Sequence, residues 1–297
     1  YTYAWGGSIN YTTVSIRQMT ALEYITGHFD SDVEIVPEEE ILGDRDVDQN
    51  RERNLQLMDS SQQDAAAVAL EVLGYEVDAT LEGYIVRDVL DGYPVSDVLD
   101  RDDLIVELDG HPIDHPGALE EALDQAEPGE VVDIVVQPHH IDGTEVEVGE
   151  PEERTLELSE APDEDRAILG VLVERAGPRY NFPIDIQFDT GDVGGPSAGL
   201  AFSLALIDLL SPGELTGGLD VAVTGSLSWQ GAVGPVGGTP QKVVAARQAG
   251  MDVFIVPAGI DELDEVIERA GDDIEVIPVS SIDEALDALA ERGGDPV

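Results

Sequence analysis

The sequence contains no cysteine, and this absence excludes disulfide bonds and thiolate metal sites. No apolar run reaches the length of a transmembrane helix, and no signal peptide is visible. Basic residues are few: 14 Lys and Arg stand against 64 Asp and Glu, for a formal net charge of −50. Nucleic acids and anionic membrane surfaces attract proteins of the opposite charge, so we expect neither as a direct partner. The charge instead predicts adaptation to high salt, with a cationic partner as the alternative.

Lysine is nearly absent from the chain. Lys242 is the only one, so the other 13 of the 14 basic residues are arginines. Arginine stays protonated in proteins, whereas a buried lysine can lose its proton. A single lysine in a chain that otherwise uses arginine therefore predicts a task that needs a neutral amine. An ordinary surface lysine is the alternative.

The length of 297 residues predicts about two domains. The apolar spacing between Asp59 and Leu73 predicts a helix, and residues 80–160 have the composition of short strands with an Asp109-Gly110 turn. After residue 160 the pattern alternates between strands and helices, which is typical of a mixed α/β layer. Expected strands cover 10–16, 181–189, 220–228, 252–257 and 274–279, and expected helices cover 197–210, 240–248, 261–270 and 281–292. We therefore divide the chain into residues 1–78, 79–160 and 161–297.

A G-x-S-x-G pattern occupies residues 195–199, between an expected strand and an expected apolar helix. This context is typical of a nucleophile elbow, which exposes a serine hydroxyl at a sharp turn. N–H groups at a helix start are unpaired and can bind an oxyanion. The candidate nucleophile is therefore Ser197. Taken alone, the pattern more often marks a serine that caps a helix, with glycines that turn the chain.

The residue that could activate Ser197 is found by elimination. An α/β-hydrolase places its histidine after the serine, but every histidine here precedes it: His28, His111, His115, His139 and His140. A chymotrypsin-like order would need an all-β double barrel, which the alternating pattern does not supply. Lys242 remains, at the start of an expected helix. A desolvated lysine amine can serve as a general base, and the helix dipole at that end lowers its pKa further.

Three segments in this order resemble the proteolytic domain of Lon-type serine peptidases. They are Gly-Gly-Pro-Ser-Ala-Gly at 194–199, Val-Thr-Gly at 223–225, and Gly-Pro-Val-Gly-Gly at 234–238 followed by Lys242. The resemblance implies that Ser197 is the nucleophile and Lys242 the general base, 45 residues later. It also implies that Thr224 holds the lysine amine.

The same resemblance implies that the backbone beside Ser197 forms the oxyanion loop, with Gly195, Pro196 and Ala198 as its members. Substrates would be polypeptides, cleaved through an acyl-enzyme. The sequence departs from the family pattern at two positions. Gly194 and Ser226 stand where many family members have acidic residues.

The region 79–160 is similar to a PDZ domain, through Gly83-Tyr84-Ile85-Val86 and the segment from Asp97 to Ile113. PDZ domains bind extended peptides, often C-termini, by adding them as a strand. The resemblance implies that residues 83–86 are the carboxylate-binding loop and the strand that receives the peptide. The usual double glycine is only half present, because Glu82 precedes Gly83. A small β-domain with a purely structural role is the alternative.

As a whole, the chain resembles bacterial membrane-anchored, PDZ-containing Lon-like proteases. The expected fold class is α+β: a Lon-type mixed α/β proteolytic domain, to which residues 1–78 contribute, with an inserted β-rich PDZ domain. The chain begins at Tyr1 rather than at Met. We expect an N-terminal membrane anchor before it and an extracytoplasmic body.

The expected function is that of an ATP-independent serine endopeptidase that cleaves unfolded or flexible polypeptides. A G-x-x-x-x-G-K-[ST] loop is absent around the single lysine, so we expect no ATP hydrolysis by this chain. We also expect no metal and no cofactor. A PDZ scaffold with an inactive protease-like domain is the alternative function. A phosphate-binding loop at residues 190–199 is a third interpretation, but its spacing fits neither the dinucleotide-binding fingerprint nor the Walker loop. The oligomeric state stays open.

Overall fold

A computed structural model describes residues 6–27, 33–42, 46–90, 92–142, 145–161, 166–191 and 193–297. The chain divides into two compact units. The first, which we call the discontinuous unit, consists of residues 1–77 and 182–297. The second, the inserted unit, consists of residues 78–181. The expected α/β architecture with a β-rich insertion is confirmed.

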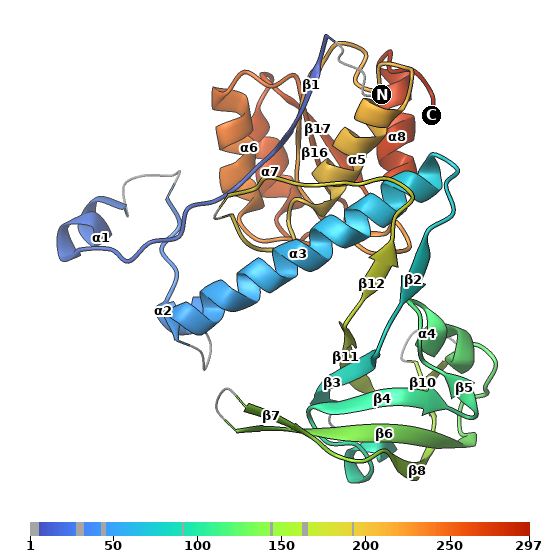
Figure 1. The fold of residues 1–297 in the computed structure, drawn as a ribbon. Coiled ribbons are helices and arrows are strands. Elements are labelled where there is room, and N and C mark those ends of the chain that lie inside the picture. The colour runs from blue at the N-terminus through green and yellow to red at the C-terminus, as the bar shows by residue number, and fades with distance from the viewer. Residues whose placement is uncertain are drawn as a thin grey trace. The chain divides into compact units, whose positions relative to one another are not determined.

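A parallel four-stranded sheet forms the centre of the discontinuous unit, in the order β1-β13-β16-β17 (Figure 1). Successive side chains of a strand point to opposite faces, and both faces of this sheet are buried. Val221 and Val223 belong to the apolar cluster on one face, whereas Ala222 belongs to the cluster on the other. The strands are β1 (Ser8–Tyr11), β13 (Asp220–Val223), β16 (Val253–Pro257) and β17 (Glu275–Val279).

Helices supply the rest of both clusters. Residues of α3 (Val47–Val72), α5 (Gly199–Leu210) and α8 (Ile282–Glu291) pack in one cluster, and those of α6 (Thr239–Gln248) and α7 (Leu263–Ala270) pack in the other. The result is a layer of helices on each face of the sheet. Shorter elements of this unit are α1 (Ala21–Gly27), α2 (Glu38–Leu42), β14 (Ser226–Leu227) and β15 (Val233–Gly234).

The helix starts follow local chemistry. Asp46 and Gln49 form a reciprocal capping box at the start of α3, and the hydroxyl of Ser281 accepts from the Glu284 N–H at the start of α8. At α6 the cap is Gly238, in the left-handed conformation, and Pro240 lies in the first turn. These caps fix where each helix begins, and in α6 they set the position of Lys242 in the first turn.

The inserted unit is built on an antiparallel sheet in the order β11-β3-β4-β6-β7, with β5 paired to β4 and β8 paired to β6 (Figure 1). β2 and β12 also pair, so Asp78 lies opposite Asn181. The two ends of this unit therefore lie side by side, as an insertion into another domain requires. Its elements are β2 (Asp78–Thr80), β3 (Gly83–Val89), η1 (Pro94–Asp97), β4 (Asp103–Leu108), β5 (His111–Pro112), α4 (Ala118–Leu123), β6 (Val131–Asp142), β7 (Glu145–Val148), β8 (Glu152–Glu157), β9 (Ser159–Glu160), β10 (Ala167–Ile168), β11 (Val171–Ala176) and β12 (Arg179–Asn181).

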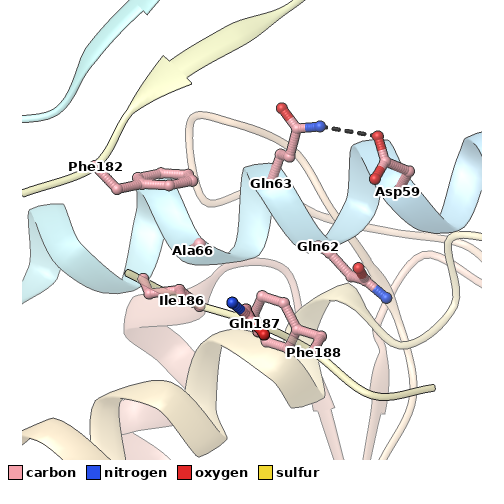
Figure 2. Close-up of a pocket in the computed structure, with 8 residues that line it drawn as sticks. All are labelled: Asp59, Gln62, Gln63, Ala66, Phe182, Ile186, Gln187 and Phe188. Atoms are coloured by element: carbon pink, nitrogen blue, oxygen red, sulfur yellow. Dashed lines mark hydrogen bonds between the residues drawn. The ribbon is translucent and has the colours of Figure 1, made fainter. Parts of the chain in front are cut away.

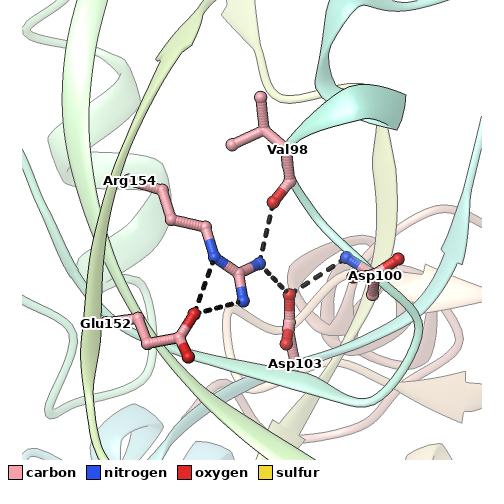
Figure 3. A network of polar contacts seen from close by, with 5 residues as sticks. All are labelled: Val98, Asp100, Asp103, Glu152 and Arg154. Atoms are coloured by element: carbon pink, nitrogen blue, oxygen red, sulfur yellow. Dashed lines mark hydrogen bonds and ion pairs between the residues drawn. The ribbon is translucent and has the colours of Figure 1, made fainter.

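A charged network ties β8 of the inserted unit to the turn before β4 (Figure 3). The Arg154 guanidinium donates to Asp103 Oδ2 at 2.6 Å and to the Val98 carbonyl at 2.7 Å. It also pairs with Glu152 at 2.9 Å. Asp103 accepts in addition from the Asp100 N–H at 3.0 Å. A buried carboxylate with this many donors is paired on every side, which is how charge is tolerated in an interior.

Two details of the expected organisation differ from the structure. The inserted unit continues to Asn181 rather than ending at residue 160, because β11 pairs with β3 along its whole length. Residues 182–190 are not a strand, because no other strand pairs with them in the described chain. Instead, Phe182, Ile186 and Phe188 pack against the apolar cluster of the discontinuous unit. The alternation of apolar residues over 182–190 predicted which side of this segment is buried. It could not show that the segment lacks a pairing strand in the described chain.

Two expected boundaries also moved. The helix expected from residue 59 begins at Val47, since the polar stretch before it is helical too. The strand expected over residues 10–16 is β1, which ends at Tyr11. Among the described residues, none of the helices is both long and apolar enough to cross a membrane.

Candidate active site

Ser197 lies in a turn between the irregular segment after the inserted unit and the start of α5. Its side chain is half-buried, and Ala198, which caps α5, is buried. Gly195 precedes it in a left-handed conformation (φ +95°), which glycine adopts at little energetic cost. The chain therefore turns sharply just before the serine, as the sequence pattern predicts.

The two peptide units that meet at Ser197 are held by their carbonyl groups. The Pro196 carbonyl accepts from Ser61 Oγ at 3.2 Å, and the Ser197 carbonyl accepts from the Gly225 N–H at 3.0 Å. In the described chain, the N–H groups of Ser197 and Ala198 have no hydrogen-bond partner. Two free N–H groups beside a serine hydroxyl are the arrangement that stabilises an oxyanion.

Lys242 points from the first turn of α6 into the interior of the discontinuous unit. It is only 2% exposed, and its Nζ donates to Thr224 Oγ1 at 3.0 Å. No carboxylate pairs with it among the described residues. Burial lowers the pKa of Lys242 from 10.5 to about 8, because a charged amine in this interior lacks the solvation that water provides. Near neutral pH a usable fraction of the amine is therefore unprotonated.

Thr224 links the lysine to the serine. It is fully buried, and its hydroxyl donates to the Ser197 carbonyl at 3.4 Å while accepting from Lys242. Gly225 follows with φ +149°, and a Cβ there would lie 3.0 Å from the Val233 side chain. Only glycine fits this position, and its N–H and C=O bond to Ser197 and Leu200 respectively. The Thr-Gly pair thus joins the end of β13 to residues 194–198, which carry the candidate nucleophile Ser197 and which we call the nucleophile loop.

The structure therefore brings together Ser197, Thr224 and Lys242, which are distant in sequence. The Lys242 amine bonds to Thr224, and within the described chain it makes no hydrogen bond to the Ser197 hydroxyl. Catalytic hydrogen bonds are often long without substrate and shorten when it binds. Of the histidines, His111 and His115 belong to the inserted unit, and His28 lies outside the described residues.

Helix α3 contributes contacts to this site that the sequence did not predict. The Gly195 N–H donates to the Asn54 carbonyl at 2.7 Å, and Gln62 Nε2 donates to Thr190 Oγ1 at 3.1 Å. A Cβ at Gly194 would lie 2.9 Å from the Asn54 Cβ. This close approach leaves no room for a side chain at position 194, so glycine is the residue that fits there. The apolar spacing had located the helix, but its polar positions carried no local signal of these contacts.

A pocket of about 320 Å³ lies along another face of α3, against the segment 182–188 (Figure 2). Its walls combine the rings of Phe182 and Phe188 with the polar side chains of Asp59 and Gln63, which are hydrogen-bonded to each other at 2.9 Å. It contains none of the residues Ser197, Thr224 and Lys242. Among the described residues, no cluster of side chains is suited to holding a metal ion.

Residues 83–86 of the inserted unit were expected to form a carboxylate-binding loop and a strand that receives a peptide, and the strand pairing contradicts the second of these roles. Residues 83–86 lie in β3, which pairs with β11 on one side and β4 on the other. Val86 is fully buried, Ile85 is half-buried, and the Tyr84 hydroxyl accepts from the Gly117 N–H at 3.2 Å. A Cβ at Gly83 would collide with the Ile105 carbonyl. β3 is thus paired on both edges at Tyr84 and Ile85, which leaves no free edge there to which a peptide strand could add.

Comparisons with known proteins find similarity over the C-terminal part of the chain. Residues 180–292 match the model of the Lon protease (S16) C-terminal proteolytic domain. This part of the chain is similar to Lon proteolytic domains. The archaeal Lon protease of Archaeoglobus fulgidus is 41% identical over 117 residues, 38% of this chain and 18% of that protein. The Lon protease of Orientia tsutsugamushi is 33% identical over 115 residues, 37% of this chain and 14% of that protein. The chain thus spans less than a fifth of these Lon relatives.

Among solved structures, the PDZ domain of an SdrC-like protein from Listeria monocytogenes is 23% identical, covering 31% of this chain and 87% of that chain with a TM-score of 0.26. The corresponding domain from Listeria innocua is 22% identical, covering 31% of this chain and 92% of that chain, also with a TM-score of 0.26. The Lon-like match begins at residue 180 and so does not include α3, although α3 contacts the nucleophile loop.

Proposed function

We propose that this chain is an ATP-independent serine endopeptidase in which Ser197 is the nucleophile and Lys242 the general base. The observation that carries the proposal is the state of Lys242. It is a buried amine with no carboxylate partner among the described residues, its pKa is lowered to about 8, and one hydroxyl connects it to the Ser197 backbone. This geometry lies in a segment similar to Lon proteolytic domains.

The proposed reaction has two stages. The neutral Lys242 amine takes the proton of Ser197 Oγ as this oxygen attacks the scissile carbonyl, and the carbonyl oxygen becomes an oxyanion that faces the Ser197 and Ala198 N–H groups. The Lys242 ammonium then gives its proton to the leaving amine as the C–N bond breaks, which leaves an acyl-serine. In the second stage water attacks the ester, its proton passes to Lys242, and Ser197 Oγ recovers a proton as the acid product leaves.

Thr224 has an orienting role in this scheme. Its bond to Nζ uses one N–H of the amine and fixes the direction of the remaining N–H and the lone pair. Because Thr224 also bonds to the Ser197 carbonyl, the base and the nucleophile loop move as one. A neutral amine held in this way can reach the serine hydroxyl once substrate closes the remaining gap.

Polypeptides are the proposed substrates. From Thr12 to Thr20 the chain after β1 is stretched out and belongs to no helix or strand (Figure 1), and Val14 and Ile16 are exposed. In this segment the Thr12 N–H still donates to the Val223 carbonyl of β13 at 3.3 Å. Val14 lies against Gly238, the cap of the helix that carries Lys242. An extended backbone edge beside the base is suited to an extended substrate. The sequence contains no ATP-binding loop, so flexible or unfolded chains are the expected targets.

We propose further that the inserted unit binds extended peptides, including C-termini, at β11 rather than at β3. β11 is the last strand of its sheet, with β3 on only one side. Leu172 on this strand is 54% exposed, and Val171 and Val173 pack against the core. Peptide binding to the full chain carrying Ser197→Ala tests this, with fluorescence anisotropy as the readout. Leu172→Asp should weaken binding, whereas Leu209→Asp on the discontinuous unit should not.

The decisive test of the peptidase is the cleavage of casein in molar salt without ATP. Wild type should degrade casein, and Ser197→Ala and Lys242→Gln should each abolish the activity. Ser203→Ala serves as the matched control, because Ser203 is a buried serine on α5 with no role in the mechanism. If wild type and both site variants give the same background, the chain is instead a PDZ scaffold with an inactive protease-like domain.

A further inference from the structure

The contact between α3 and the nucleophile loop includes one side chain with no role so far. Ser61 is 5% exposed and lies in the middle of α3. Its hydroxyl donates to the Pro196 carbonyl at 3.2 Å, across 135 positions of sequence. The inserted unit lies between these two residues in the chain. Folding, rather than sequence proximity, therefore supplies this partner to the residue before the nucleophile.

The direction of this hydrogen bond is unusual for a helical serine. A serine inside a helix commonly donates back to the carbonyl one turn earlier. Ser61 donates to the Pro196 carbonyl instead, and the first residue of α5, which lies beside the Ser61 hydroxyl, is Gly199. A Cβ at Gly199 would lie 2.8 Å from the Ser61 Oγ. The start of α5 thus rests directly against this hydroxyl, and no larger residue fits at Gly199 without moving it.

The planarity of the peptide bond transmits this contact to the reacting centre. The Pro196 C=O and the Ser197 N–H belong to one trans peptide unit, so they point in opposite directions. A carbonyl that is held toward α3 by Ser61 directs the Ser197 N–H away from α3. The Gly199 N–H also donates to this carbonyl, at 3.3 Å, but as a longer bond from the next turn. Among the described residues, Ser61 supplies the one side-chain donor to the Pro196 carbonyl.

We propose that Ser61 is a positioning residue, which acts through the Pro196 carbonyl to aim the Ser197 N–H at the oxyanion of the tetrahedral intermediate. The inference rests on the proposed peptidase function. Ser61 touches neither substrate nor the reacting atoms. Its counterpart on the other side of Ser197 is the pair of Gly225 and Thr224, which hold the Ser197 carbonyl and so direct the Ala198 N–H. The oxyanion site is thereby built by three separate segments of the chain.

The test uses the full chain and a fluorogenic peptide that contains a casein site cut by wild type. Ser61→Ala should lower kcat by about 10-fold to 100-fold, since the loss of a direct oxyanion donor lowers rates by about 10²-fold to 10³-fold and Ser61 acts one step removed. KM should change less than about twofold, because ground-state binding does not use the oxyanion donor. The pH midpoint of kcat should not move, because Ser61 does not contact Lys242. Ser61→Thr, which keeps the hydroxyl, should recover most of the rate.

Ser60→Ala is the matched control, since Ser60 is the neighbouring serine on the same helix with no hydrogen bond to the loop in the described structure. It should behave as wild type. A Ser61→Ala enzyme with wild-type kcat overturns the inference, as does a change in KM or in the pH midpoint alone. Should Ser61→Ala fail to fold, Ser61→Cys replaces it, because it keeps the volume with a weak donor. A wild-type chain without Ser197-dependent cleavage overturns the proposed function itself, independently of residue 61.

Discussion

Arg154 of the inserted unit and Lys242 of the discontinuous unit both carry a cationic group away from bulk water, Arg154 half-buried and Lys242 buried, and their surroundings differ in opposite ways. Arg154 in the inserted unit is surrounded by acceptors: Asp103, Glu152 and the Val98 carbonyl (Figure 3). Burial by itself would lower the pKa of Arg154, but the two carboxylates raise it above its usual value. Lys242 in the discontinuous unit has one hydroxyl and no carboxylate in the described chain, and burial lowers its pKa to about 8.

The difference separates a cation that is held charged by its partners from one whose amine can titrate near neutral pH. A chain with 64 acidic residues could easily have placed one beside Lys242. A carboxylate there would hold the amine in its charged form and prevent it from taking a proton from serine. Pairing makes Arg154 a fixed tie between β8 and the start of β4. The lack of pairing leaves Lys242 free to titrate, and this is the property that general-base chemistry needs.

The largest effect should come from converting the reactive cation into a permanent one. Lys242→Arg should lower kcat by more than about 10³-fold, because arginine does not lose its proton in proteins and so cannot act as a base. Casein cleavage and peptide turnover measure the loss. Activity retained within tenfold of wild type would show that a group other than residue 242 accepts the proton of the serine hydroxyl.

Lys242→Met is the control for that substitution, because it removes the charge while keeping an unbranched apolar chain. It should be as inactive as Lys242→Arg but at least as stable as wild type at pH 7. The folded-state pKa of Lys242 lies below the unfolded value, so the buried ammonium disfavours the folded state below about pH 8. This stability advantage of Lys242→Met should shrink as the pH rises toward 10, as urea unfolding at both pH values can measure.

Breaking the structural cation should act on stability instead. Arg154→Leu should lower the free energy of unfolding by about 3 kcal/mol, because Asp103 is left as a buried carboxylate without its partner. The double variant Asp103→Leu/Arg154→Leu should recover more than half of this loss, since no lone charge remains. Urea unfolding at constant molar salt measures both. If the double variant is less stable than the single one, the network stabilises through its shape rather than through charge compensation.

The titration of Lys242 predicts the pH profile. With a pKa of about 8, the neutral fraction of the amine rises about tenfold between pH 7 and pH 9, and kcat/KM should rise with it. Thr224→Val should move this midpoint to lower pH, because the lost hydroxyl accepts most strongly from the charged form. Thr224→Ser should keep the midpoint. A profile that stays flat until about pH 10 would mean that Lys242 is not desolvated in solution.

The smallest expected effect concerns a buried serine that is not used. In the described structure Ser203 is fully buried and its hydroxyl has no hydrogen-bond partner. Ser203→Ala should raise the free energy of unfolding by up to about 1 kcal/mol without changing turnover, because an unsatisfied hydroxyl is removed from the interior. Thermal unfolding and peptide cleavage test the two parts. A destabilised Ser203→Ala would indicate a partner for this hydroxyl in solution.

Much of the fold follows from local patterns. The alternation of strands and helices after residue 182, the Asp109-Gly110 turn and the helices at α5, α6, α7 and α8 were predicted because each depends on residues close in sequence. The structure of residues 182–190 was not predicted, since the same alternation of apolar residues occurs in a paired strand and in an unpaired segment that packs over a core. The prediction that residues 83–86 receive a peptide as an added strand was wrong for a related reason. Composition identifies a strand, but its place at the edge or inside a sheet depends on strands distant in sequence.

For the site, the sequence by itself determined the chemistry: one serine after a glycine turn, one lysine among arginines, and a threonine between them in chain order. These are properties of residue type and spacing, so they can be identified from the sequence alone. Only the tertiary structure decided how they are used. It buried Lys242 with no carboxylate partner in the part of the chain that the structure describes, directed its amine to Thr224, and brought Ser61 to the Pro196 carbonyl. Burial and hydrogen-bond partners depend on which segments fold together, and Ser61 is separated from Pro196 by the entire inserted unit.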